Sequence, residues 1–216
     1  MRLRELHIKN LNSLYGEYHI DFQNEAYEQS GIFAITGPTG SGKTTIMDGI
    51  CLALFGSTPR LERLSASSND IMSKGEGECH AKLVFELKGT VYACEWNQAR
   101  ARKKADGKLQ AAKHIISNVT DDKALATTLS QTPRVVEEIT GMDFDRFTRS
   151  MMLAQGKFGA FLKAKADERS PILEQITGTQ IYSDISKEAF EKQKLEQEKL
   201  KELKLATENL QVLTGE

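Results

Sequence analysis

Cysteine is scarce in this sequence, and its spacing argues against two common roles. There are three cysteines, Cys51, Cys79 and Cys94, and no two of them form a C-x-x-C pair. Neither a disulfide framework nor a cysteine-based zinc site is therefore indicated. A reducing compartment is expected, which favours the cytoplasm.

Long apolar runs are absent as well. No segment approaches the ~20 apolar residues that a membrane-spanning helix needs, and the charged start of the chain has no signal-peptide core behind it. The formal net charge of −1 gives no reason by itself to expect a membrane or a nucleic acid as partner. The 216 residues are 39% hydrophobic, which suffices for a folded core.

The spacing of apolar residues divides the chain into a strand-rich part and a helical part. Alternation predicts strands over residues 3–9, 18–22, 81–87, 92–96 and 109–120, and a short apolar run predicts a buried strand at 31–36. Helices are predicted after residue 44 and over residues 133–141, 143–151 and 167–177, with Gly141 at one helix end and Asp143 as the next cap.

The last part of the chain is rich in Glu, Lys, Leu and Gln and predicts one long exposed helix. Its apolar positions keep no steady heptad register, and a coiled coil is favoured over a single solvated helix. We therefore expect a compact domain over residues 1–179 and the start of a coiled-coil arm over residues 180–216.

A glycine-rich loop gives the strongest functional signal. Residues 37–44 read GPTGSGKT, which fits G-x-x-x-x-G-K-[ST], and they stand between a predicted strand and a predicted helix. In such a loop, backbone N–H groups and a helix N-terminus face the phosphates of a nucleotide. Lys43 is expected to reach the β- and γ-phosphates of ATP, and the Thr44 hydroxyl to bind Mg²⁺. The predicted nucleotide contacts are Gly37, Pro38, Thr39, Gly40, Ser41, Gly42, Lys43, Thr44 and Thr45.

The acidic partner of this loop is missing. Hydrolysis requires a second acidic site for Mg²⁺ and for the attacking water, and four apolar residues followed by Asp-Glu occur nowhere in the chain. The N-K-x-D tetrad that recognises guanine is also absent, which disfavours a GTPase. The catalytic apparatus in this sequence is therefore incomplete.

Three blocks of sequence together resemble the bacterial SbcC family, the SMC-like ATPase subunits of SbcCD nucleases. The blocks are IKNLNSLYGEYHIDF, GIFAITGPTGSGKTTIMDGICLALFGSTPRL and FTRSMMLAQGKFGAFLKAKADERSPILEQITGT. The resemblance implies an α/β P-loop NTPase fold of the ATP-binding-cassette head type, with a mixed sheet and an added antiparallel layer. It also implies that this chain is the N-terminal half of a split head, whose Walker B acids and signature motif lie in the other half.

The same resemblance implies partners and a setting. They are the C-terminal half of the head, a second SbcC-like subunit that pairs around ATP, an SbcD-like nuclease subunit, and DNA ends or hairpins; no membrane is implied. The complete protein would be an ATPase of the cytoplasm, associated with the nucleoid and active in DNA repair. This chain alone would bind ATP and barely hydrolyse it.

Two further site predictions depend on the resemblance. Gln155 in LAQGKF matches the family's Q-loop glutamine, which meets Mg²⁺ and the water near the γ-phosphate. Near Asn12 and Ser13 many relatives carry an arginine that contacts phosphate. This chain has no arginine there, and a weaker neutral contact from Asn12 or Ser13 is expected.

A basic segment is a candidate contact for DNA. Between residues 99 and 113 six basic side chains accompany a single acidic one, Asp106. The six are Arg100, Arg102, Lys103, Lys104, Lys108 and Lys113. A cationic hairpin tip can neutralise DNA phosphates, and a solvated loop is the alternative.

Two other functions compete with this interpretation. A transporter cassette ATPase shares the phosphate loop and Q-loop, but it would lack the Lys- and Glu-rich terminal helix and would carry its signature motif in the same short chain. A small-molecule kinase needs an acidic residue to activate the acceptor hydroxyl, and the sequence offers no convincing candidate.

Overall fold

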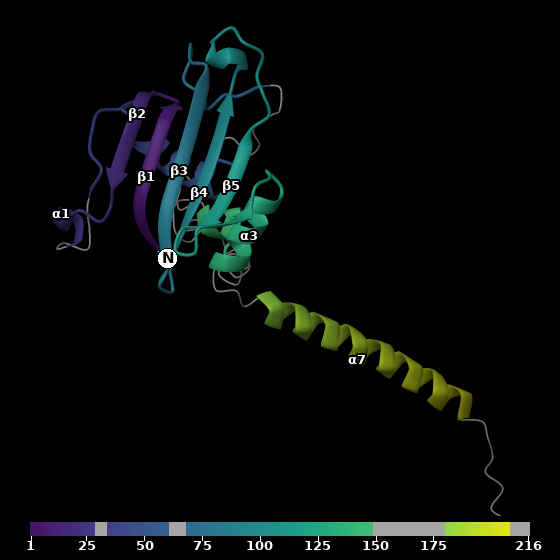
Figure 1. The fold of residues 1–216 in the computed structure, drawn as a ribbon. Coiled ribbons are helices and arrows are strands. Elements are labelled where there is room, and N and C mark those ends of the chain that lie inside the picture. The colour runs from purple at the N-terminus through teal and green to yellow at the C-terminus, as the bar shows by residue number, and fades with distance from the viewer. Residues whose placement is uncertain (29–33, 61–67, 149–179, 208–216) are drawn as a thin grey trace, which may run out of the picture. The chain divides into compact units, whose positions relative to one another are not determined.

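The computed structural model describes residues 1–28, 34–60, 68–148 and 180–207, which belong to two compact units, Met1–Ala154 and Gln155–Glu216 (Figure 1). The elements of the first unit are β1 (Arg2–Leu11), β2 (Leu14–Asp21), α1 (Glu25–Glu28), α2 (Lys43–Phe55), β3 (Glu78–Leu87), β4 (Thr90–Ala99), the 3₁₀ turn η1 (Ala101–Lys103), β5 (Lys113–Asn118), β6 (Lys123–Ala126), α3 (Gln131–Thr140) and α4 (Phe144–Arg146). The second unit contributes α7 (Gln180–Thr207). None of the helices described is both long and apolar enough to cross a membrane.

The first unit is built on a six-stranded sheet with the order β2-β1-β3-β4-β5-β6 (Figure 1). Every described pairing is antiparallel, which confirms the expected antiparallel layer. The strand β6 was not expected from the sequence. The buried strand predicted at 31–36 is not found: residues 34–36 form no strand, and residues 31–33 lie outside the described part, so the parallel portion of the expected mixed sheet has no described strand.

One face of the sheet packs against α2, which contacts β1, β3 and β4. The alternation of β1 and β3 explains this, because every second side chain of a strand points to the same face. Leu6 and Ile8 of β1 and Leu83 and Phe85 of β3 are almost fully buried. The helix approaches closely because Gly49 has no side chain: a Cβ there would lie 2.8 Å from the Ile8 Cδ1 atom. The opposite face of these strands carries the polar residues of the alternation.

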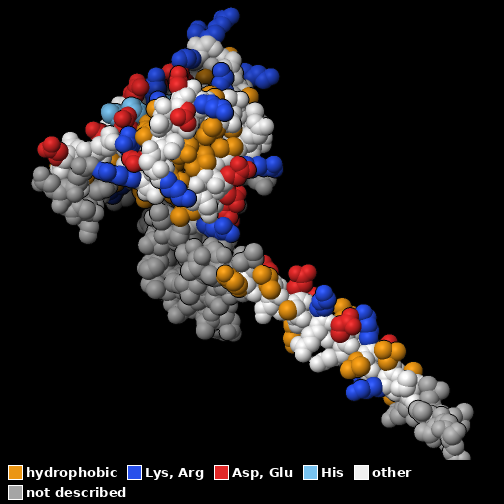
Figure 2. Space-filling view, turned by 60° about the horizontal axis from the view of Figure 1, so that its bottom comes forward, with side chains coloured by type: hydrophobic (Ala, Val, Ile, Leu, Met, Phe, Trp, Pro, Cys, Tyr) orange, Lys and Arg blue, Asp and Glu red, His pale blue; other side chains and the backbone are white. Residues whose placement is uncertain are grey.

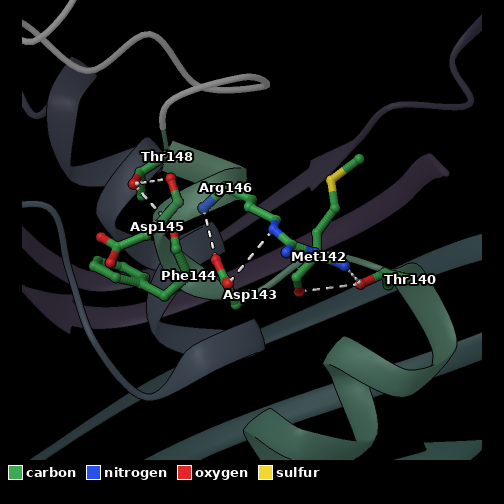
Figure 3. A network of polar contacts seen from close by, with 7 residues as sticks. All are labelled: Thr140, Met142, Asp143, Phe144, Asp145, Arg146 and Thr148. Carbon is green, nitrogen blue, oxygen red and sulfur yellow. Dashed lines mark hydrogen bonds and ion pairs between the residues drawn. The ribbon is translucent and has the colours of Figure 1, made fainter. Parts of the chain in front are cut away.

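The turn between α3 and α4 is held by side-chain hydrogen bonds (Figure 3). The Met142 N–H donates to the Thr140 hydroxyl at 3.2 Å. The Asp143 carboxylate accepts from the Arg146 N–H at 2.7 Å, which confirms the predicted helix cap. The Thr148 hydroxyl lies 2.9 Å from the Phe144 carbonyl oxygen. Gly141 ends α3 in the left-handed conformation, as predicted.

The second unit contains the long helix that the sequence predicted. Its exposed apolar side chains are Tyr182, Ile185, Phe190, Leu195, Leu200, Leu203 and Leu205. Exposed apolar residues along one helix are typical of a segment that packs against a partner helix. The coiled coil itself stays a prediction.

A buried histidine lies where β5 meets the end of α2. His114 is fully buried, and its Nε2–H donates to the Ala53 carbonyl oxygen at 2.8 Å. Its other ring nitrogen, Nδ1, has no hydrogen-bond partner among the described residues. Burial lowers the pKa of His114 to about 4, and the bond to Ala53 offsets only part of that effect. The folded chain therefore carries this imidazole in the neutral form.

The stability of the fold should fall when the pH drops from 6.5 toward 4. In that window the unfolded chain binds a proton at His114 that the folded chain does not, so each pH unit costs about 1.4 kcal/mol at most from this residue. Urea unfolding followed by the emission of the buried Trp96, the only tryptophan, measures the effect. His114→Gln should flatten the dependence relative to the wild type. Equal slopes in wild type and His114→Gln would contradict the assignment.

Candidate nucleotide-binding site

The last two residues of the glycine-rich loop, Lys43 and Thr44, begin α2. The Lys43 ammonium donates to the carbonyl oxygens of Gly37 and Pro38, each at 2.7 Å, and lies 3.5 Å from the Ser41 Oγ atom. The lysine cation is thus held over the loop by backbone oxygens that a phosphate group can replace. Gly40 and Gly42 adopt φ angles of 85° and 88°, which are open to glycine and strained for other residues.

The N-terminus of α2 is left without a cap. Gly42 precedes the helix and provides no side-chain hydrogen bond, and the first turn contains no acidic residue. The first N–H groups of an α-helix, here those of Lys43, Thr44 and Thr45, have no carbonyl partner within the helix. Together with the helix dipole they favour an anion at this end, which fits a phosphate group.

The turn between β1 and β2 packs against the loop. A Cβ at Gly42 would lie 2.4 Å from a methyl carbon of Leu14, the first residue of β2, so the two segments touch, and the φ of 88° at Gly42 favours glycine. Asn12 lies in this turn with a φ of 50°, and its N–H donates to the Ile71 carbonyl oxygen at 2.7 Å. Its side-chain amide points toward Asp48 of α2, at 3.4 Å, while Ser13 is exposed. The turn is therefore beside the loop, and its contact with phosphate stays a prediction.

A buried carboxylate lies one turn further along α2. Asp48 is 1% exposed, and one of its oxygens, Oδ2, accepts two hydrogen bonds from the Arg60 guanidinium, that from Nε at 3.0 Å. Among the described residues no donor reaches the other oxygen. Burial raises the pKa of the Asp48 carboxyl, and the arginine offsets part of the rise. This pair ties the segment after α2 to the helix that carries Lys43.

The pair of Asp48 and Arg60 was not predicted from the sequence, although a signal was present. Asp48 interrupts the apolar run of the helix, with Met47 before it and Ile50 two positions after it, which places its charge on a buried side. A buried carboxylate needs a hydrogen-bonding cation, and Arg60 is the first arginine that follows. Spacing alone could not identify which cation folds back.

The remaining residues predicted to contact the nucleotide differ in how exposed they are. Thr44 is exposed at the helix start, where its hydroxyl is open to a ligand, and Thr45 is 2% exposed and turned into the fold. Thr39 and Ser41 are exposed in the loop. Gln155 lies outside the described residues.

The basic segment forms an ordered tip at the end of β4. The Arg100 N–H donates to the Gly77 carbonyl oxygen at 2.7 Å, and the Ala101 N–H to the Lys108 carbonyl oxygen at 2.8 Å. A Cβ at Gly77 would lie 1.9 Å from the Lys103 carbonyl oxygen, so the tip rests directly on the chain before β3. We call residues 100–108 the basic tip.

One cation of the basic tip is already paired. The Lys103 ammonium lies 2.7 Å from Glu78, which also meets Lys9 at 2.9 Å. Lys103 and then Lys9 hold the pKa of the Glu78 carboxyl below its usual range. The side chains of Arg102, Lys104 and Lys108 are exposed, and Lys and Arg side chains gather at one end of the unit in Figure 2.

The chain is similar in sequence to known proteins. A sequence-family model described as "AAA domain" matches residues 5–216. The chain is 40% identical over 219 residues to the SbcC component of the SbcCD nuclease of Pseudomonas aeruginosa, covering 94% of this chain and 18% of the relative. It is 36% identical to the SbcC component of Rhodobacter capsulatus, covering 89% of this chain and 17% of the relative. The resemblance noted in the sequence is confirmed, and the chain spans less than a fifth of these relatives.

A solved structure shares the fold. It is described as "Structural biochemistry of ATP-driven dimerization and DNA stimulated activation of SMC ATPases", and it matches with a TM-score of 0.51 and 19% sequence identity. The match covers 82% of this chain and 99% of that one. At this identity the likeness concerns the fold, and it agrees with the P-loop NTPase head expected from the sequence.

Proposed function

Because the chain belongs to the AAA domain family, we propose that it binds ATP with Mg²⁺ as the N-terminal half of an SbcC-like ATPase head. The observation that carries the proposal is the uncapped N-terminus of α2 with Lys43 held over the glycine-rich loop. Backbone N–H groups, a helix dipole and a cation converge there, and together they are suited to a chain of phosphates.

The chain's own groups have separate roles in this proposal. Lys43 leaves the loop carbonyls and binds the β- and γ-phosphates, and Thr44 offers its hydroxyl to the metal. Gln155 contributes a contact near the γ-phosphate, and Asn12 or Ser13 a neutral one. Bound Mg²⁺ would neutralise charge on the phosphate oxygens. Asp48 and Arg60 keep α2 and the following segment in place.

Turnover requires residues that this chain does not provide. The missing acids and signature motif would come from the C-terminal half of the head and from a second head that closes over the nucleotide. The nucleotide state would then govern how the heads engage and how a partner nuclease reaches DNA ends. A transporter cassette is not favoured, because the relatives are nuclease components by name. A comparison of ATP binding with ATP turnover tests the proposal.

We place the complete protein in the cytoplasm, associated with the nucleoid. DNA is its proposed macromolecular ligand, and the basic tip is the proposed contact on this chain. Phosphate neutralisation supplies most of the affinity in such contacts. Backbone hydrogen bonds hold the main chain of the tip in one conformation.

Neutralising the basic tip should weaken duplex binding by the complete complex. In the triple variant Arg102→Gln, Lys103→Gln, Lys104→Gln, the slope of log affinity against log salt should fall by about 2, because each free phosphate contact contributes about 0.9 and Lys103 is already paired with Glu78. Fluorescence anisotropy at several salt concentrations measures the slope.

The matched control for the basic tip removes two exposed lysines at the opposite end of the strands. Lys88 follows β3 and Lys123 begins β6, both far along the sheet from the tip. The double variant Lys88→Gln, Lys123→Gln should leave the salt slope nearly unchanged. An unchanged slope in the triple variant would contradict the proposed DNA contact and indicate that the basic tip is a solvated loop.

A further inference from the structure

Two histidines and a glutamate gather on the face of the sheet that α2 does not cover. Glu5 and His7 alternate along β1 with the buried Leu6, so both point to the outer face. His19 of β2 is the direct cross-strand partner of His7. Figure 2 shows histidine side chains gathered on the surface among charged ones.

The three side chains converge on a single point. The Nε2 atom of His7 lies 3.1 Å from the Glu5 Oε2 atom, and the Nε2 atom of His19 lies 3.5 Å from that same oxygen. The two imidazole rings stack with centroids 4.1 Å apart. One ligand atom from each of the three residues lies within 4.8 Å of the other two.

These spacings suit a transition-metal ion. Zinc binds histidine nitrogen and carboxylate oxygen at about 2.0–2.2 Å, and neighbouring corners of a tetrahedron of that size are about 3.3 Å apart. Both nitrogen-to-oxygen distances are already close to this value. The nearly parallel rings must turn about χ2 to aim their lone pairs at one ion, and terminal torsions of this kind are soft. Side-chain exposures of 31% for His7 and 51% for His19 leave room for the turn.

We propose that Glu5, His7 and His19 bind one divalent transition-metal ion of the zinc type, with water in the remaining positions. Two imidazoles and one carboxylate are a donor set for zinc, copper or nickel, whereas magnesium and calcium prefer oxygen alone. Binding requires imidazole nitrogens whose lone pairs are free to meet the ion.

Two neighbouring charged residues affect how favourable the site is for a cation, and neither is one of the proposed ligands. Asp21 lies opposite Glu5 in the register of β1 and β2, and its negative charge favours a cation nearby. Lys82 of β3 lies opposite His7 and acts against the ion. The site lies on the face of the sheet opposite to α2, the helix that begins with Lys43 of the glycine-rich loop.

Zinc titration of the full-length protein by calorimetry tests the proposal. The wild type should bind one zinc equivalent more tightly than His19→Gln, with at least a tenfold loss of affinity or the loss of that equivalent in the variant. Glu5→Gln should weaken the same equivalent. Cobalt substitution gives a second readout, because the visible absorption of bound Co²⁺ should fall in both variants.

The matched control is His80→Gln. His80 lies on β3 and pairs with one acidic residue, Glu95, at 3.3 Å, and it does not belong to the described cluster of Glu5, His7 and His19. Its removal should leave zinc binding unchanged, and Mg²⁺ should not compete. Equal zinc stoichiometry and affinity in the wild type and His19→Gln, with Trp96 emission showing both folded, would overturn the proposal. Equal losses in His19→Gln and His80→Gln would overturn it as well.

Discussion

Replacing Lys43 with alanine is expected to reduce the affinity of this chain for Mg-ATP at least a hundredfold. The loss corresponds to about 2.7 kcal/mol. Lys43 is the only side-chain cation within residues 37–44, and its ammonium is held by the Gly37 and Pro38 carbonyl oxygens at the place where phosphates would enter. Removing it leaves backbone N–H groups alone against several negative charges. Isothermal titration with ATP and Mg²⁺ measures the change.

A matched lysine separates this effect from a general change in charge. Lys123 at the start of β6 is exposed, and Lys123→Ala should keep the wild-type affinity. Trp96, buried in the sheet, reports by its emission whether each variant is folded. Undiminished ATP affinity in a folded Lys43→Ala variant would refute the role of the loop.

Binding and turnover should separate in this chain. We expect measurable Mg-ATP binding together with hydrolysis many orders of magnitude below the ~10 per second of a median enzyme. Lys43 and Thr44 supply phosphate and metal contacts, and Gln155 is predicted to lie near the γ-phosphate. None of them is the acid that positions water and completes the metal site, and charge stabilisation dominates phosphoryl transfer. A phosphate-release assay beside the calorimetry measures both quantities.

The complementary experiment restores the missing groups. Adding the C-terminal half of the head as a separate polypeptide should recover hydrolysis, and a variant of that half without its catalytic acid should not. The Lys43→Ala chain should fail in the same mixture. If this chain alone hydrolysed ATP at about the median enzyme rate, an acid within it would complete the site and the split-head proposal would be wrong.

Local patterns predicted the elements that depend on neighbouring residues. The hairpin of β3 and β4 follows from two alternating runs around Lys88 and Gly89, and both of these residues adopt positive φ angles. Asp143 was recognised as a helix cap because its carboxylate needs only an N–H three residues later. The loop at residues 37–44 was found because its chemistry is contained in one short segment.

Features that depend on residues far apart along the chain were not predicted from the sequence. The pairing of Asp48 with Arg60 needs the chain after α2 to fold back. The histidine pair depends on strand register, since a shift of one residue would move His19 to the other face. The strand β6 has four residues, too few for an alternating pattern to be recognised in the sequence. It forms by pairing with β5 at the edge of the sheet.

The support beneath the basic tip has an entropic consequence. Arg102 and Lys103 hold left-handed backbone conformations, with φ angles of 56° and 54°, which residues with side chains adopt only when surrounding contacts demand it. The conformational freedom of this segment is therefore lost when the chain folds, before any ligand arrives. A polyanion that meets the tip finds its backbone preorganised and orders little additional main chain. Glycine at position 77 makes this possible, since it lets one backbone rest on another.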